Sequence, residues 1–118
     1  MDQHLQPENV RPWGRYDVLD EASGFKVKRV TVNPGQRLSY QRHAKRSEYW
    51  TLAVGQARVT LDGAMMEKSR GDAIFIPAGM KHRVENIGKE ALIFIEVQVG
   101  DYFGEDDIER FEDDYGRA

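Results

Sequence analysis

The sequence predicts an all-β fold, either a sandwich or a barrel. Short runs rich in β-branched and aromatic residues follow one another from Arg15 to Val99, and turn residues separate them. No stretch between these runs has the 3.6-residue periodicity of an amphipathic helix. A chain of 118 residues has room for one domain with one core.

The expected elements can be placed in chain order. Residues 1–10 are polar and aperiodic, which predicts an N-terminal arm before a single domain at 11–118. Residues 11–14 predict a turn. The expected strands are residues 16–19, 25–32, 37–43, 48–54, 56–61, 65–68, 73–76, 82–86 and 91–99. Pro34-Gly35 suits a type II turn and Asp62-Gly63 suits a tight hairpin. Residues 106–111, with an acidic first turn, predict a short helix.

Composition narrows the class of protein. The chain has no cysteine, which excludes disulfides and thiolate metal sites. It has no run of eighteen apolar residues and no signal-peptide pattern, so we expect a cytoplasmic protein that does not enter a membrane. The net charge is −3, but residues 105–118 carry seven acidic side chains and two arginines. The remainder is therefore slightly basic, which favours a small anionic ligand over nucleic acid.

Two glycine-anchored motifs organise the chain. The first has Gly35, Gln41, His43, Glu48 and Gly55, and the second has Gly71, Pro77, Gly79, His82 and Asn86. These spacings resemble the paired motifs of the cupins, except that cupins usually have histidine where this chain has Gln41. The resemblance implies a double-stranded β-helix (jelly-roll barrel) that holds a metal, here with a short C-terminal helical segment.

Four side chains form the candidate metal site. Gln41 and His43 are two residues apart, so strand alternation places them on one face; Glu48 follows a short connection, and His82 begins a distant strand. Imidazole nitrogens with carboxylate and amide oxygens suit one divalent ion, zinc, manganese or similar. In the alternative, the barrel is metal-free, with both histidines in the core and Glu48 paired with a neighbouring lysine or arginine.

Further segments resemble one family. They are residues 11–14, 25–29, 38–41, 46–50, 76–82 and 96–98, and, most specifically, the ending at 100–108 and 114–117. From residue 11 to its end the chain resembles the type II phosphomannose isomerase cupin, the C-terminal module of mannose-1-phosphate guanylyltransferase/mannose-6-phosphate isomerases. The resemblance implies a homodimer that supplies GDP-mannose for polysaccharides. The glycine-rich nucleotide loop is absent from these residues, so nucleotidyl transfer is not expected. Ala44, Lys45 and Tyr49 stand where the family commonly has histidine.

The implied reaction interconverts mannose 6-phosphate and fructose 6-phosphate. It needs a proton shuttle between C1 and C2, for which the candidates are Lys45 and Glu96. The phosphate needs cations, and Arg46, Lys81 and Arg117 are the candidates. The competing hypothesis is a non-catalytic cupin that binds a sugar phosphate or a nucleotide sugar. The absence of histidine at positions 44, 45 and 49 supports it.

Overall fold

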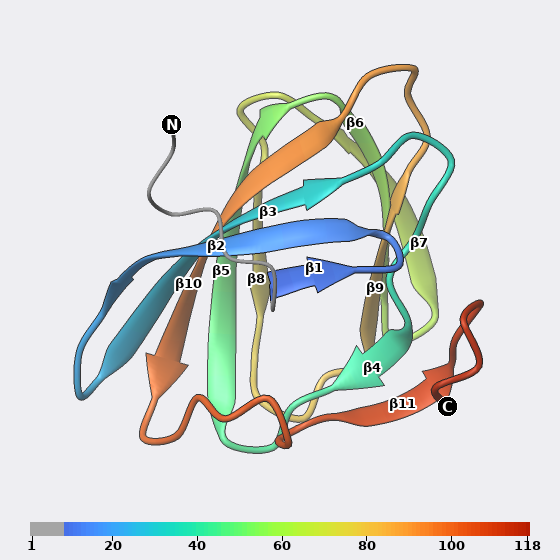
Figure 1. Cartoon of the computed structure of the whole chain (residues 1–118). Coiled ribbons are helices and arrows are strands. Elements are labelled where there is room, and N and C mark those ends of the chain that lie inside the picture. The colour runs from blue at the N-terminus through green and yellow to red at the C-terminus, as the bar shows by residue number, and fades with distance from the viewer. Residues whose placement is uncertain (1–8) are drawn as a thin grey trace.

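The protein is seen in a computed structural model that describes residues 9–118. The expected arm at 1–10 lies almost wholly outside the described residues. Two antiparallel sheets make up the fold (Figure 1). The six-stranded sheet has the order β1 (Val10–Arg11), β2 (Gly14–Glu21), β3 (Phe25–Val32), β10 (Leu92–Gly100), β5 (Arg46–Val54), β8 (Ala73–Ile76). The five-stranded sheet has the order β11 (Glu109–Glu112), β4 (Tyr40–Arg42), β9 (His82–Asn86), β6 (Gln56–Leu61), β7 (Ala64–Ser69).

The all-β prediction is confirmed, and β3, β6, β8 and β9 have the predicted bounds. The turns follow from their residues. Asp62 and Gly63 both have positive φ, 45° and 84°, as a two-residue type I′ hairpin requires between β6 and β7. Gly35 has a φ of 78°, and the Gln36 amide donates to the Asn33 carbonyl at 3.1 Å, which closes the turn after β3.

The helix expected at residues 106–111 does not form. Glu109 and Arg110 pair instead with Arg42 and Gln41 of β4, as part of strand β11. A helix of six residues gains little from propensity alone, whereas the edge of β4 offers backbone partners along its length. Among residues 9–118 no helix is long and apolar enough to cross a membrane.

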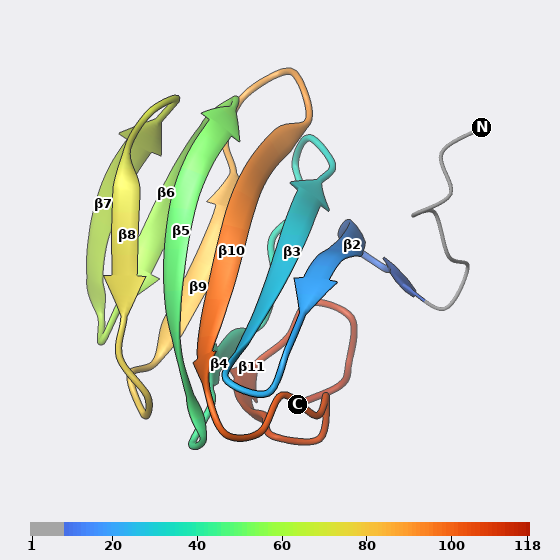
Figure 2. The ribbon, with the colours of Figure 1, turned by 90° about the vertical axis from the view of Figure 1, so that its left-hand side faces the viewer.

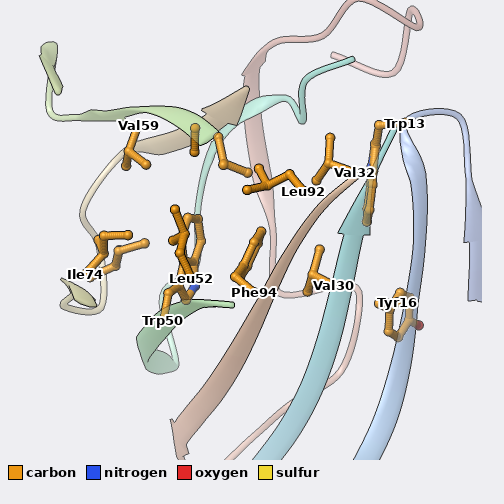
Figure 3. Packing of buried hydrophobic residues seen from close by; sticks show 13 residues of the cluster. Trp13, Tyr16, Val30, Val32, Trp50, Leu52, Val59, Ile74, Leu92 and Phe94 are labelled. Carbon is orange, nitrogen blue, oxygen red and sulfur yellow. The ribbon is translucent and has the colours of Figure 1, made fainter. Parts of the chain in front are cut away.

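The two sheets face each other (Figure 2). Buried apolar side chains from both sheets form one cluster between them. Trp50 of β5 stacks on Phe94 of β10 with ring centroids 4.4 Å apart, and Val59 joins the cluster from the other sheet (Figure 3). Val84, also from the other sheet, belongs to the same cluster. Trp50, Phe94, Val59 and Val84 are all 2% exposed or less. Burial of this apolar surface is the main favourable term for folding.

The inward-facing side chains are apolar toward one end of the strands and polar toward the other. In β10 the inward positions are Leu92 and Phe94 and then Glu96 and Gln98, all buried. In β3 the same alternation places Lys28 on the face of Val30 and Val32. In β5 it runs from Arg46 and Glu48 to Trp50 and Leu52. Because β10 pairs with both β3 and β5, the polar positions meet at one end of the barrel and the apolar ones at the other.

Candidate metal centre and its cavity

Three of the four expected metal ligands lie together at the polar end. His43 follows β4, Glu48 lies in β5 and His82 begins β9, and one side-chain donor atom of each lies within 4.8 Å of the others. All three side chains are buried. The strand pairings of the two sheets therefore bring together the residues that the motif spacing singled out.

The hydrogen bonds of both histidines leave the same nitrogen available. Nδ1 of His43 lies 2.7 Å from the Asp107 carbonyl oxygen, and Nδ1 of His82 lies 3.0 Å from the Met80 carbonyl oxygen. A carbonyl only accepts, so each Nδ1 carries the proton and each Nε2 is left for another partner. Burial lowers the pKa of His43 to about 4, so this imidazole is neutral at neutral pH. Nε2 of His82 is buried and has no hydrogen-bond partner among residues 9–118. Orphaned buried nitrogens are rare, and this one fits a metal ligand.

Glu48 supplies the negative charge of the site. Its Oε1 accepts from the Trp50 indole at 2.9 Å, and its Oε2 lies 3.4 Å from His43 Nε2. Burial opposes its ionisation, but the electrostatic interactions of Glu48 with His82 and then with Arg46 outweigh it and hold the pKa of Glu48 at about 2. The residue is therefore a carboxylate at neutral pH, in the state that a metal requires.

Gln41 lies next to this cluster. It pairs in register with His82 across β4 and β9 and lines the same cavity, and its Oε1 accepts from the Ser39 hydroxyl at 3.1 Å. An amide oxygen has a second lone pair, so this hydrogen bond leaves room for another partner. Two imidazoles, a carboxylate and an amide oxygen fit a divalent cation.

Arg46 is the residue that complicates the site. Its side chain is buried, its Nε donates to Glu48 Oε2 at 2.8 Å, and its Nη2 lies 3.1 Å from His43 Nε2. The guanidinium thus contacts two of the three candidate ligand atoms.

A small cavity of about 80 Å³, partly open to solvent, adjoins the centre. Gln41, His43 and Glu48 form part of its wall. The other charged side chains that line it are Arg11, Lys28, Arg46, Glu96, Glu105, Arg110 and Arg117.

Glu96 is a carboxyl group with an altered pKa in this cavity. Burial is the main reason that the pKa of Glu96 is raised to about 7, and the negative charge of Glu48 is the second. Gln98 Nε2 donates to Glu96 Oε2 at 2.6 Å, and Lys28 lies directly opposite on β3. Glu96 can therefore exist in either protonation state near neutral pH, which is the property that general acid–base chemistry requires.

The residues after β10 close one side of the cavity. Figure 1 shows this segment running along the end of the barrel to β11, beside β4. It contributes Glu105, Ile108, Arg110 and Arg117 to the cavity wall. It is held by Lys28, whose ammonium lies 3.0 Å from the Glu105 carboxylate, and by Asp107, whose carboxylate accepts the amides of Ala44 and Lys45.

The chain matches a known protein family. Residues 1–113 match the family described as "Mannose-6-phosphate isomerase C-terminal". The chain belongs to this family.

Its relatives are much longer proteins. A mannose-1-phosphate guanylyltransferase ManC of Salmonella typhimurium is 47% identical over 117 residues, which are 99% of this chain and 24% of the relative. A xanthan biosynthesis protein XanB of Xanthomonas campestris is 50% identical over 108 residues, 92% of this chain and 23% of the relative. The chain thus spans about a quarter of the length of these relatives.

Solved structures show the same barrel. A Klebsiella pneumoniae protein with a double-stranded β-helix domain superimposes with a TM-score of 0.74 at 24% identity, covering 95% of this chain and 99% of that one. An oxalate decarboxylase of Bacillus subtilis with Mn(II) centres superimposes with a TM-score of 0.73 at 27% identity, covering 86% of this chain and 29% of that one. The cupin fold is therefore confirmed.

The remaining predicted site residues are not all in the cavity. Lys45 and Lys81 do not line it: the ammonium of Lys45 lies 4.8 Å from the centre of the Tyr102 ring, and that of Lys81 lies 4.2 Å from the centre of the Phe111 ring. The chain turns between β4 and β5, which carries Lys45 outward. Arg117 lines the cavity, but its guanidinium binds both oxygens of Asp113 at 2.8 Å.

Three cations of the cavity, Arg11, Lys28 and Arg110, were missed by sequence reasoning. Lys28 could have been found, because alternation in its strand places it on the buried face of Val30 and Val32. Arg110 could not, because its position depends on the pairing of β11 with β4. Nε of Arg110 is buried without a hydrogen-bond partner, and burial, with the neighbouring Arg117 next, lowers the pKa of Arg110.

Proposed function

We propose that the chain is a metal-dependent aldose–ketose isomerase that interconverts mannose 6-phosphate and fructose 6-phosphate. One observation carries the proposal: a single cavity is lined by candidate metal ligands, by a carboxyl group with a pKa near 7, and by several cations. Membership of the mannose-6-phosphate isomerase family supports the same reaction. The names of relatives in xanthan and alginate biosynthesis favour a role in making polysaccharide precursors such as GDP-mannose.

Gln41, His43, Glu48 and His82 would hold one divalent ion, zinc, manganese or similar. When bound, such an ion supplies Lewis-acid stabilisation of the negative charge that develops on the oxygens at C1 and C2 of the sugar. The carbonyls of Asp107 and Met80 accept from Nδ1 of the two rings, which leaves Nε2 of each ring as the nitrogen that can bind a metal. These carbonyls fix the orientation of the two rings.

Glu96 would move the proton. As a carboxylate it accepts the proton on C2 of the open-chain aldose, and as the acid so formed it returns the proton to C1. The hydroxyl proton on the C2 oxygen passes to the C1 oxygen, which leaves the ketose. A pKa near 7 suits both steps at neutral pH. Gln98 holds the carboxyl group in place by donating to Oε2. Lys45 has no part in this scheme, because its side chain does not line the cavity.

The substrate phosphate would lie toward Arg110 and Arg117. Arg110 is the better anion donor, because its Nε has no partner, whereas Arg117 is neutralised by Asp113. Charge-assisted hydrogen bonds to phosphate are among the strongest in proteins. Lys81 does not line the cavity and is given no role in phosphate binding.

The test is turnover of mannose 6-phosphate by the purified chain, followed by coupling fructose 6-phosphate to a reporter enzyme. Activity is expected with zinc or manganese and is expected to disappear with chelator. Glu96→Gln should lower kcat by about 10²–10⁴-fold while mannose 6-phosphate still binds. Glu67→Gln, at an exposed position on β7, is the matched control and should turn over like the wild type. Full activity of Glu96→Gln would overturn the assignment of the base.

The second candidate is a cupin that binds a sugar phosphate or nucleotide sugar without converting it. The contacts of Arg46 with Glu48 and His43 favour it, because a cation already occupies part of the metal site. Saturable binding of mannose 6-phosphate with no turnover in any divalent metal would select this candidate. In either case we propose that the protein is cytoplasmic and forms a homodimer. Light scattering of the purified chain would test the dimer.

A further inference from the structure

Arg46 and a metal ion would need the same atoms. The imidazole Nε2 of His43 has a single lone pair, and the guanidinium Nη2 lies 3.1 Å from it. The Glu48 oxygen that faces His43 is Oε2, and this oxygen accepts from Arg46 Nε at 2.8 Å. Occupation of His43 Nε2 by a metal therefore excludes the hydrogen bond from Arg46.

Charge adds to this steric exclusion. A guanidinium beside a divalent ion is repelled, and the repulsion is strong because the site is buried and weakly screened. Without a metal, the same guanidinium stabilises the protein, because it neutralises Glu48, whose side chain is 2% exposed. The site thus has one resident cation and a set of donor atoms suited to another.

The cavity offers Arg46 other acidic groups when it leaves Glu48. Arg46 lines the cavity, and Glu96 and Glu105 also attract its guanidinium, each less strongly than Glu48 does. A guanidinium released from Glu48 would carry an unpaired charge into the part of the cavity where Glu96 lies. There it can donate to an anionic ligand.

We propose that Arg46 is a cation that competes with the metal, and that metal binding frees its guanidinium to bind an anionic substrate. Metal and anion would then bind cooperatively, and the coupling must be reciprocal: each ligand tightens the other by the same factor. The inference rests on the metal site of the proposed function. It adds the expectation that the protein without metal binds its anionic substrate more weakly than the metal-loaded protein.

The experiment measures zinc or manganese binding by calorimetry, and inorganic phosphate binding with and without the metal. The proteins are the wild type, Arg46→Met and, as matched control, Arg83→Met. Arg83 is also a buried arginine, but it bonds the Leu38 carbonyl and Glu112 and does not line the cavity. We expect Arg46→Met to bind metal about 5- to 150-fold more tightly than the wild type, the usual range of such couplings, and Arg83→Met to bind like the wild type.

Phosphate binding is the second measurement. It can be made on the wild type alone, so it does not depend on whether Arg46→Met folds. Metal should tighten phosphate binding by the wild type and by Arg83→Met, and by a smaller factor in Arg46→Met, where only direct contact of phosphate with the metal remains. The melting temperature of metal-free Arg46→Met should fall, because Glu48 loses its counter-ion, and metal should restore it. If Arg46→Met does not fold without metal, Arg46→Lys, which keeps the charge but cannot contact both atoms, should show the intermediate affinity.

The outcomes separate the two proposals. Equal metal affinity in wild type and Arg46→Met, or no effect of metal on phosphate binding by the wild type, would overturn the role of Arg46 while leaving the metal site. Metal binding by Arg46→Met alone would support the competition and overturn the metal-dependent function. An absence of metal binding in every variant would overturn both.

Discussion

Glu96 is a single carboxyl group whose charge depends on its position in the strand. Alternation along β10 points it inward, where it is 6% exposed and close enough to Glu48 to feel its charge. Burial and that charge raise its pKa to about 7. Because the folded state then holds a proton that the unfolded state has released, the stability that this group contributes is lost as pH rises from about 4.5 through 7.

Glu96→Gln removes this cost at high pH. The amide keeps the shape and can accept from Gln98. We expect the variant to have a higher free energy of unfolding than the wild type at pH 8, by at most about 3 kcal/mol, and nearly the same value at pH 5. Urea unfolding of the metal-free proteins at both pH values measures the difference. A difference that does not change between pH 5 and pH 8 would show that Glu96 titrates as it does in the unfolded chain.

His82 has the clearest sign of a missing partner, a buried Nε2 that makes no hydrogen bond within residues 9–118. A metal that binds only the folded state adds about 2.7 kcal/mol of stability at a free concentration 100 times its Kd. Chelator should therefore lower the melting temperature of the metal-loaded wild type and leave that of His82→Ala almost unchanged. Gln41→His should bind metal more tightly than the wild type, because imidazole replaces a weaker amide donor. The same response to chelator in wild type and His82→Ala would remove His82 from the site.

At the scale of elements, the segment after β10 matters most. Asp107 joins it to the metal centre twice: its carboxylate accepts the Ala44 and Lys45 amides at 2.9 Å, and its carbonyl orients His43. The turn between β4 and β5 is thus held by a residue more than sixty positions away. Lys28 and Glu105 add a second link across the cavity.

Asp107→Ala removes the two carboxylate hydrogen bonds and lets the turn after His43 move. We expect a loss of about 1–3 kcal/mol in unfolding free energy and a metal affinity about 10- to 100-fold weaker, as for other groups that orient a ligand. Asp106→Ala is the matched control, because the Asp106 carboxylate accepts from the exposed Tyr102 hydroxyl, whereas the turn amides donate to Asp107. Thermal unfolding and calorimetric titration measure both effects. Equal metal affinity in the two variants would mean that the turn does not set the position of His43.

The elements that could be predicted from sequence are those with local signals. Alternation and turn residues were enough for β3 and β6, and the motif spacing picked out His43, Glu48 and His82. The strand at Glu109–Glu112 was missed, because its acidic pattern suits a helix and its actual partner, β4, lies far back in the chain. Lys45 was predicted to act in the site as a proton shuttle. A strand that continued past His43 would have pointed Lys45 toward the metal, but β4 ends at Arg42 and the chain turns there.

At the scale of the whole molecule, the barrel interior is divided into two parts. Trp50 and Phe94 belong to an apolar part that holds the sheets together, and Glu96 and Lys28 belong to a polar part that lines the cavity. The strands β3, β5 and β10 each contribute side chains to both parts. The polar groups are costly to bury and are tolerated where the apolar part provides stability.

The whole chain is therefore expected to fold and to act without further residues. The described barrel carries the candidate metal ligands, Glu96 and Arg110, which are all the groups that the proposed isomerisation uses. We expect the 118-residue chain, loaded with zinc or manganese, to convert mannose 6-phosphate into fructose 6-phosphate and to show no transfer from GTP to mannose 1-phosphate. A coupled assay for fructose 6-phosphate and a pyrophosphate assay measure the two activities side by side. If the metal-loaded chain binds mannose 6-phosphate but does not convert it, the barrel is a binding module, and its relatives' longer chains must supply what the reaction lacks.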